Sequence, residues 1–136
     1  MAKANEEQLA EIMGWHADRQ KELSDDQRAE NKTKFAALMG DADKMQAAKA
    51  EADATFAASD TNQDGTLTLA EFQDFAAKSR ANAAAKGWHM PENREGDVEK
   101  WWSKMCEIAG TPNGISKADH DSIQAQVMGA WAAKMQ

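Results

Sequence analysis

Cysteine, tyrosine and proline are scarce in this chain. Its 136 residues contain one cysteine, Cys106, two prolines and no tyrosine. A single thiol excludes an internal disulfide, which indicates a reducing, cytoplasmic setting. Because proline is rare while alanine, lysine, glutamate and methionine are abundant, we expect one all-α domain over residues 1–136. The cysteine stands in "WWSKMCEIAG" on an apolar helix face, where we expect a buried, inert thiol.

Long apolar runs and basic clusters are also lacking. No segment approaches the ~18 consecutive apolar residues of a membrane span, and glutamates interrupt the N-terminal stretch where a secretory signal needs an apolar run. The formal net charge is −7, with acidic residues in both halves. Without a basic stripe, nucleic acid is a poor partner. The acidity suits cations or basic peptides, and equally an ordinary solvated surface.

Groups that would form an enzyme active site are missing. His16, His89 and His120 are far apart, none in the H-E-x-x-H spacing, and no serine or cysteine stands in an obvious relation to them. The segment "GTPNG" lacks the lysine and the following Ser or Thr of a phosphate-binding loop. His120 in "ADHD" could bind a transition metal, or belong to a solvated helix start. We expect no catalytic activity.

Apolar periodicity and capping patterns predict six helices. The S-x-x-Q sequence Ser24–Gln27 has the form of a capping box, and Gly87 suits a left-handed C-terminal cap. The helices are expected over residues 6–23, from Ser24 to Met39, from Asp41 or Asp43 to the start of "DTNQDG", over residues 70–86, from Val98 to "AGTPNG", and from Ser116 onward. Helices one and two are expected to form an N-terminal hairpin, residues 1–41, that covers the remainder.

Oxygen-bearing side chains alternate in "DTNQDGTLTLAE", Asp60–Glu71, between the third and fourth helices. A divalent cation such as calcium needs six to eight oxygen ligands, which a short loop supplies when alternate residues turn inward. Asp60, Asn62 and Asp64 fall at loop positions 1, 3 and 5. Gly65 at position 6 permits the sharp turn.

The second half of this loop completes the pattern. Thr66 at position 7 offers its backbone carbonyl, and Thr68 at position 9 is placed to hold a water molecule. Glu71 at position 12 reaches back with both carboxylate oxygens. Leu67 at position 8 points away from the ion, where it can enter the core and its strand can pair with a second loop.

The stretch resembles the calcium loop of the EF-hand superfamily and fits D-x-[DN]-x-[DN]-G-x5-E at every specified position. Core aromatics flank it at Phe56, Phe72 and Phe75, as in such units. The resemblance implies an intact EF-hand over residues 42–87 that binds one Ca²⁺ per chain, with Mg²⁺ as a possible competitor. It also implies a dissociation constant on the order of 10⁻⁷ to 10⁻⁵ M. The implied metal ligands are Asp60, Asn62, Asp64, Thr66 and Glu71.

EF-hands usually occur in pairs, and "IAGTPNGISKAD", residues 108–119, is the best candidate for the second loop. Aligning Ile115 with Leu67 places Asp119 level with Glu71, but leaves Ile108, Gly110 and Pro112 where oxygen ligands belong. Residues 95–135 therefore resemble an EF-hand that has lost its metal and kept its pairing role. The wide spacing of the two loops resembles that of sarcoplasmic calcium-binding proteins.

Eight methionines and five tryptophans leave the function open between three readings. They could form a groove for a protein or peptide target that opens with calcium, or fill the core between alanine-rich helices. Trp101 and Trp102 cannot face the same side of one helix, so one should approach the N-terminal hairpin or a partner. We expect a calcium sensor that regulates a protein target; the alternatives are a calcium buffer of sarcoplasmic type and a structural adaptor stabilised by calcium.

Overall fold

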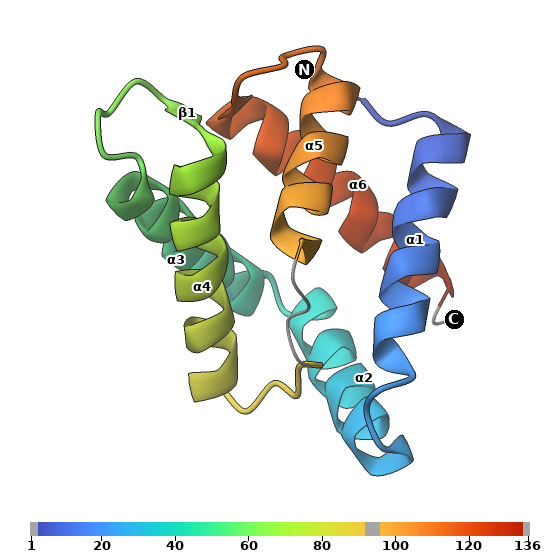
Figure 1. The fold of residues 1–136 in the computed structure, drawn as a ribbon. Helices are drawn as coiled ribbons and strands as arrows, with labels where there is room; N and C mark the ends of the chain where they lie inside the picture. Colours follow the sequence, from blue (N-terminus) through green and yellow to red (C-terminus); the bar gives the residue numbers. More distant parts are fainter. Residues whose placement is uncertain (1–2, 92–95, 135–136) are drawn as a thin grey trace.

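The computed structural model describes residues 3–91 and 96–134; the predicted connector and the last helix thus extend in part outside the described residues. Within these ranges the regular secondary structure is helical apart from one two-stranded sheet (Figure 1). This confirms the predicted all-α class. The elements are α1 (Glu6–Gln20), α2 (Asp25–Met39), α3 (Ala42–Ser59), β1 (Thr66–Leu67), α4 (Leu69–Ala85), α5 (Asp97–Ala109), β2 (Ile115–Ser116) and α6 (Lys117–Lys134).

The helix boundaries follow the capping residues. Ser24 and Gln27 form the predicted capping box of α2, and Asp41, rather than Asp43, caps α3 through its side chain. The first helix ends at Gln20, three residues before the predicted end at residue 23. The Arg28 guanidinium accounts for this, because it donates hydrogen bonds to the carbonyls of Gln20 and Leu23 at 3.0 and 2.9 Å.

The helices pack in two groups, with α3 and α4 on one side of α5 and α6 and the N-terminal helix α1 on the other. Helix α3 lies against α4, α4 against α5, and α5 against α6. The N-terminal helices do not pack mainly on each other as the predicted hairpin would, since α1 lies against α6 and α2 against α3 (Figure 1). The largest fully buried side chains, which come from both groups, are Ile12, Leu67, Phe72, Met105, Ile115 and Ile123.

The two loops pair through a short antiparallel sheet. Leu67 lies opposite Ile115, and Thr66 lies opposite Ser116. The pairing of the two loops was predicted, and both apolar members of the pair are fully buried. Gly114 permits the approach, because a Cβ atom there would lie 2.4 Å from Thr66 Cγ2 and 3.2 Å from the Leu67 carbonyl oxygen.

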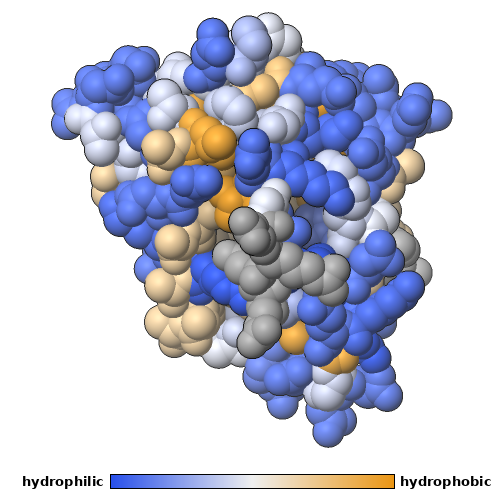
Figure 2. Space-filling view, in the orientation of Figure 1, coloured by the Kyte–Doolittle hydropathy of each residue, from blue (hydrophilic) through white to orange (hydrophobic). Residues whose placement is uncertain are grey.

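The surface is predominantly polar. Figure 2 shows a mainly hydrophilic face on which strongly hydrophobic residues occupy small, separate areas. Among the described residues, Met45 and Met90 are the exposed large hydrophobic side chains. None of the helices in the described ranges combines the length and the apolar composition needed to cross a membrane.

Candidate functional site

The loop between α3 and β1 holds its oxygen-bearing side chains through hydrogen bonds to its own backbone. Asp60 caps the end of α3, and its Oδ2 atom accepts the Gly65 N–H at 2.8 Å. Asp64 Oδ1 accepts the Thr66 N–H at 3.0 Å, and Asn62 Oδ1 accepts the Asp64 N–H at 3.4 Å. These contacts organise the turn around the alternating positions that the sequence singled out.

Two residues of the turn adopt left-handed backbone conformations. Gly65, with φ of 80°, tolerates this conformation without steric cost, as predicted from its place in the loop. Gln63, with φ of 54°, stores roughly 1 kcal/mol of backbone strain. The neighbouring side-chain-to-backbone hydrogen bonds hold the strained residue in place.

Glu71, in the first turn of α4, is buried and fully engaged. Its Oε1 atom accepts the Thr68 N–H at 3.0 Å, and its Oε2 atom accepts both the N–H and the hydroxyl of Thr61 at 2.8 and 2.9 Å. The Thr68 N–H, helped by Thr61, lowers the pKa of Glu71 below its ordinary value, although burial acts in the opposite direction. Glu71 is therefore a carboxylate near neutral pH.

Asp60 carries a buried atom without a partner. The residue is 7% exposed, and its Oδ1 atom has no hydrogen bond, while Oδ2 accepts the Gly65 N–H. A buried carboxylate oxygen without a donor is costly, so such an atom calls for a cation or water. The donor set of this loop, three carboxylates, one amide and a backbone carbonyl, consists of the hard oxygen ligands that Ca²⁺ prefers.

The predicted carboxylate ligands, Asp60, Asp64 and Glu71, do not form a ready-made metal-binding group. In the described part of the chain, no three His, Cys, Asp or Glu side chains lie close enough together to hold a metal ion. Hydrogen bonds within the loop explain part of this, because Thr61 donates to Oε2 of Glu71 and the Thr68 N–H donates to Oε1. Mutual repulsion between carboxylates acts in the same direction.

The second loop shares the frame of the first but not its ligands. Ser116 Oγ accepts the Asp119 N–H at 3.2 Å, just as Thr68 Oγ1 accepts the Glu71 N–H at 3.3 Å. In place of inward oxygens, the Thr111 hydroxyl donates to the Gly114 carbonyl at 2.6 Å and closes the turn. This loop can thus support its partner mechanically without taking a metal in the ordinary way.

Several contacts connect the first loop to the helices of the second. Trp102 Nε1 on α5 donates to the Leu67 carbonyl at 3.2 Å, and the Lys117 N–H donates to the Gly65 carbonyl at 3.1 Å. Trp101, by contrast, faces α1, where it lines the same cavity as Trp15. The two tryptophans therefore face different sides of α5, as predicted.

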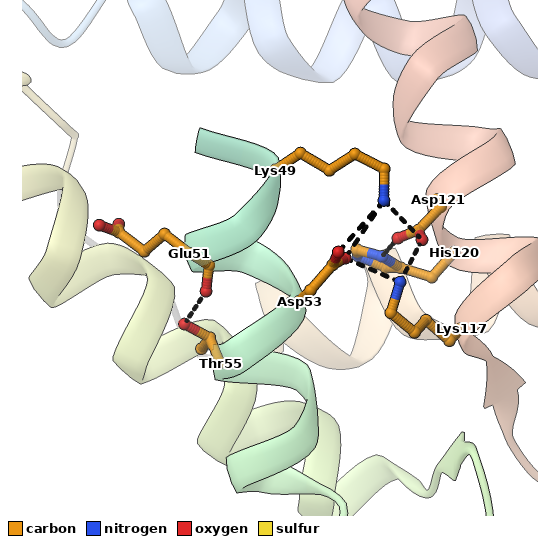
Figure 3. Close-up of polar contacts among 7 residues, drawn as sticks. All are labelled: Lys49, Glu51, Asp53, Thr55, Lys117, His120 and Asp121. Atoms are coloured by element: carbon orange, nitrogen blue, oxygen red, sulfur yellow. Dashed lines mark hydrogen bonds and ion pairs between the residues drawn. The ribbon is translucent and has the colours of Figure 1, made fainter. Parts of the chain in front are cut away.

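Ion pairs join the start of α6 to α3 (Figure 3). The Lys117 ammonium lies 2.7 Å from both Asp53 and Asp121, and Lys49 lies 3.2 Å from Asp53. Hydrogen bonds from Lys117 and then Lys49 lower the pKa of Asp53, and those with Asp121 and Asp53 raise the pKa of Lys117. The helix that enters the first loop is thus tied to the helix that leaves the second.

His120 belongs to the core, so the expectation of a solvated helix start is wrong, and in the described residues it is part of no cluster that could hold a metal. It is 4% exposed, and its ring lies 5.1 to 6.3 Å from those of Phe56, Phe72 and Phe75. Burial lowers its pKa below the ordinary value, opposed by Asp121 at 3.4 Å. Cys106 is buried as predicted, and burial raises the pKa of its thiol.

The sequence did not reveal the roles of Thr61, which stands at a loop position without a fixed residue type, and of the pair Asp53 and Lys117, whose approach depends on helix packing. The aromatic environment of His120 likewise joins three helices. No local pattern in the sequence marks these contacts. A scan against protein-family models and searches of curated proteins and of solved structures found no match to this chain.

Proposed function

We propose that this protein binds one Ca²⁺ per chain in an EF-hand loop, Asp60–Glu71, and acts as a calcium sensor that regulates a protein or peptide target. The observation that carries the proposal is the buried, unpartnered Oδ1 atom of Asp60 at the first position of that loop. A hard cation would give this oxygen the partner it lacks.

The residues that would hold the ion are those the sequence singled out. They are the side chains of Asp60, Asn62, Asp64 and Glu71, with the backbone carbonyl of Thr66. Bound Ca²⁺ supplies positive charge that offsets the repulsion between the carboxylates. Glu71 must give up hydrogen bonds to Thr61 in order to turn inward, so the Thr61 contact competes with metal binding.

The position of Glu71 supports a sensor. Glu71 lies in the first turn of α4, which packs against α3 and α5. When Glu71 exchanges its hydrogen bonds to Thr61 for Ca²⁺, the position of α4 against these two helices shifts. The shift reaches the second unit through the β1–β2 pair and through the hydrogen bond from Trp102 to the Leu67 carbonyl. The metal-free second loop would then stay in place while the first loop and α4 move relative to it.

One observation favours the alternative, a calcium buffer. Apart from Met45 and Met90, the large hydrophobic side chains in the described ranges are wholly or partly buried. A sensor must uncover some of them when calcium binds, whereas a buffer leaves them covered.

Isothermal titration calorimetry tests the binding. We expect one Ca²⁺ per chain, a dissociation constant on the order of 10⁻⁶ M, and weaker binding of Mg²⁺. At a calcium concentration 1,000 times that constant, the free energy of unfolding should rise by about 4 kcal/mol relative to the protein in chelator. Absence of binding heat together with an unchanged unfolding transition would overturn the proposal.

Retention on a phenyl column, with calcium and with chelator, separates the sensor from the buffer. A sensor should be retained more strongly in calcium, and the total tryptophan emission should change as the contact of Trp102 with Leu67 is altered. The Glu71→Gln variant is the control, since it should show neither change. Saturable calcium binding with unchanged retention would assign the protein to the buffer class.

A further inference from the structure

A large cavity lies away from the candidate calcium loop. Its volume is about 800 Å³, and its walls come from α1, α2, the end of α4 and the connector that follows, α5 and α6. No residue of Asp60–Glu71 lines it. Pockets of 300 to about 1,000 Å³ typically enclose small organic molecules.

The cavity exists because the two N-terminal helices diverge and polar contacts hold its walls. Asn31 on α2 donates to the His89 carbonyl at 2.8 Å and accepts the His89 N–H at 2.9 Å, which fixes α2 against the connector. An ion pair between Arg19 and Asp97 fixes α1 against α5. These directional contacts brace the space against collapse of the surrounding side chains.

Aromatic side chains form much of the wall. Four of the five tryptophans line the cavity, and none of them is fully buried. Each therefore keeps some surface that neighbouring side chains do not cover. Flat indole rings suit a ligand with an aromatic or otherwise apolar body. The aromatic lining consists of Trp15, Trp88, Trp101, Trp131 and Phe35.

The charge of the lining is opposite to that of the whole chain. Five cationic side chains line the cavity against two carboxylates, although the protein has a formal net charge of −7. The cations are Arg19, Arg28, Lys32, Arg80 and Lys100, and the carboxylates are Asp18 and Asp97. A local positive excess in an acidic protein favours an anionic ligand.

Two of these cations are available to a ligand. Arg19 is paired with Asp97, and Arg28 donates to backbone carbonyls and to Asp25. Lys32 and Lys100 make no ion pair with any residue in the described ranges. Lys100 instead lies over the Trp15 ring, 4.1 Å from its centroid, where charge and aromatic surface coincide.

We propose that this cavity binds an amphipathic organic acid, a small molecule with an apolar, aromatic-compatible body and one anionic group. The body would lie against the indole rings, and the anionic group would pair with Lys32 or Lys100. This site does not depend on the calcium loop. It can therefore be tested in chelator, independently of the proposed calcium binding.

A matched pair of fluorescent probes tests the proposal. 8-Anilinonaphthalene-1-sulfonate and N-phenyl-1-naphthylamine share the same rings, and the former adds a sulfonate. With the full-length protein in chelator, we expect one sulfonate probe to bind per chain, at least about 10-fold more tightly than the neutral probe. Competition by an aromatic carboxylate should displace it. Equal affinity for the two probes, or binding without saturation, would overturn the proposal.

Variants locate the binding. Lys32→Gln and Lys100→Gln should each weaken sulfonate binding about three- to tenfold without changing binding of the neutral probe. Lys44→Gln, an exposed lysine on α3 outside the cavity, removes the same charge and should change neither. If Lys44→Gln weakens binding as much as the cavity variants do, the effect is one of net charge and the proposal fails.

A cavity-filling variant provides a test that does not depend on charge. Ala17 on α1 lines the cavity, so Ala17→Phe, which fills part of it, should weaken binding of the sulfonate probe at least about 10-fold. Circular dichroism and the unfolding transition of this variant, compared with those of the wild type, check its folding. If Ala17→Phe is destabilised, Ala83→Phe on α4 is the second filling variant. Probe affinity that survives in a folded filling variant would place binding elsewhere and overturn the assignment.

Discussion

The two loops share a backbone frame and differ in chemistry. Leu67 and Ile115 face each other in the β1–β2 pair, and a hydroxyl side chain caps the following helix in each unit. The first loop holds a buried carboxylate oxygen without a partner, whereas the second closes on itself through Thr111 and Gly114. The two loops therefore differ in side-chain chemistry, and under the proposed function the first accepts a cation while the second stabilises the pair.

The strongest test of this division removes one carboxylate from each loop. Glu71→Gln takes away the charge of the proposed bidentate ligand, so the calcium dissociation constant should rise at least about 100-fold. The corresponding change in the second loop, Asp119→Asn, should leave that constant within about twofold. Calorimetry measures both, and equal effects of the two variants would contradict the division of roles.

The pairing itself can be broken at Gly114. Gly114→Ala places a methyl group against Thr66 Cγ2, and we expect the free energy of unfolding to fall by about 1 to 3 kcal/mol in urea denaturation. Thr66→Ser removes the opposing methyl group and should restore part of the loss in the double variant. Gly129→Ala in α6, where a Cβ meets nothing within 4 Å, is the control and should be neutral or stabilising.

Thr61 offers a sharper comparison between the metal-free and metal-bound first loop. Thr61→Val removes the hydroxyl bond to Glu71 and keeps the backbone donor, so calcium should bind about fivefold more tightly, equivalent to about 1 kcal/mol. The same substitution in the second loop, Thr111→Val, should not increase affinity. An increase in both variants, or a decrease in Thr61→Val, would show that Thr61 does not compete for Glu71.

The smallest effect is expected from His120, which lies between the two units. Burial lowers its pKa in the folded state, so the unfolded chain binds the proton more readily. The free energy of unfolding should fall as the pH drops below about 6.5, the ordinary histidine value, toward the lower folded pKa. Urea denaturation between pH 7.5 and about 5 should show this slope in the wild type and a shallower one in His120→Gln. Parallel slopes would show that His120 is not the source of the pH dependence.

Local patterns predicted much of the secondary structure. The capping box at Ser24 and Gln27, the end of α2 at Met39 and the turn at Gly65 depend on residues within a few positions of one another. The pairing of the two loops was also predicted by aligning two short segments, whereas its register came from the structure. Each of these features is set by backbone hydrogen bonds and torsion angles that neighbouring residues control.

The identity and order of the candidate ligands in Asp60–Glu71 are written in the sequence, because each oxygen donor is tied to a loop position. The sequence alone did not determine the divergence of α1 from α2, the large cavity, or the burial of His120 among three phenylalanines. The sequence also did not predict the hydrogen bonds from Thr61 to Glu71. These features depend on how helices that are distant in the chain pack against one another. Close packing of their side chains fixes the arrangement, and no local sequence pattern specifies it.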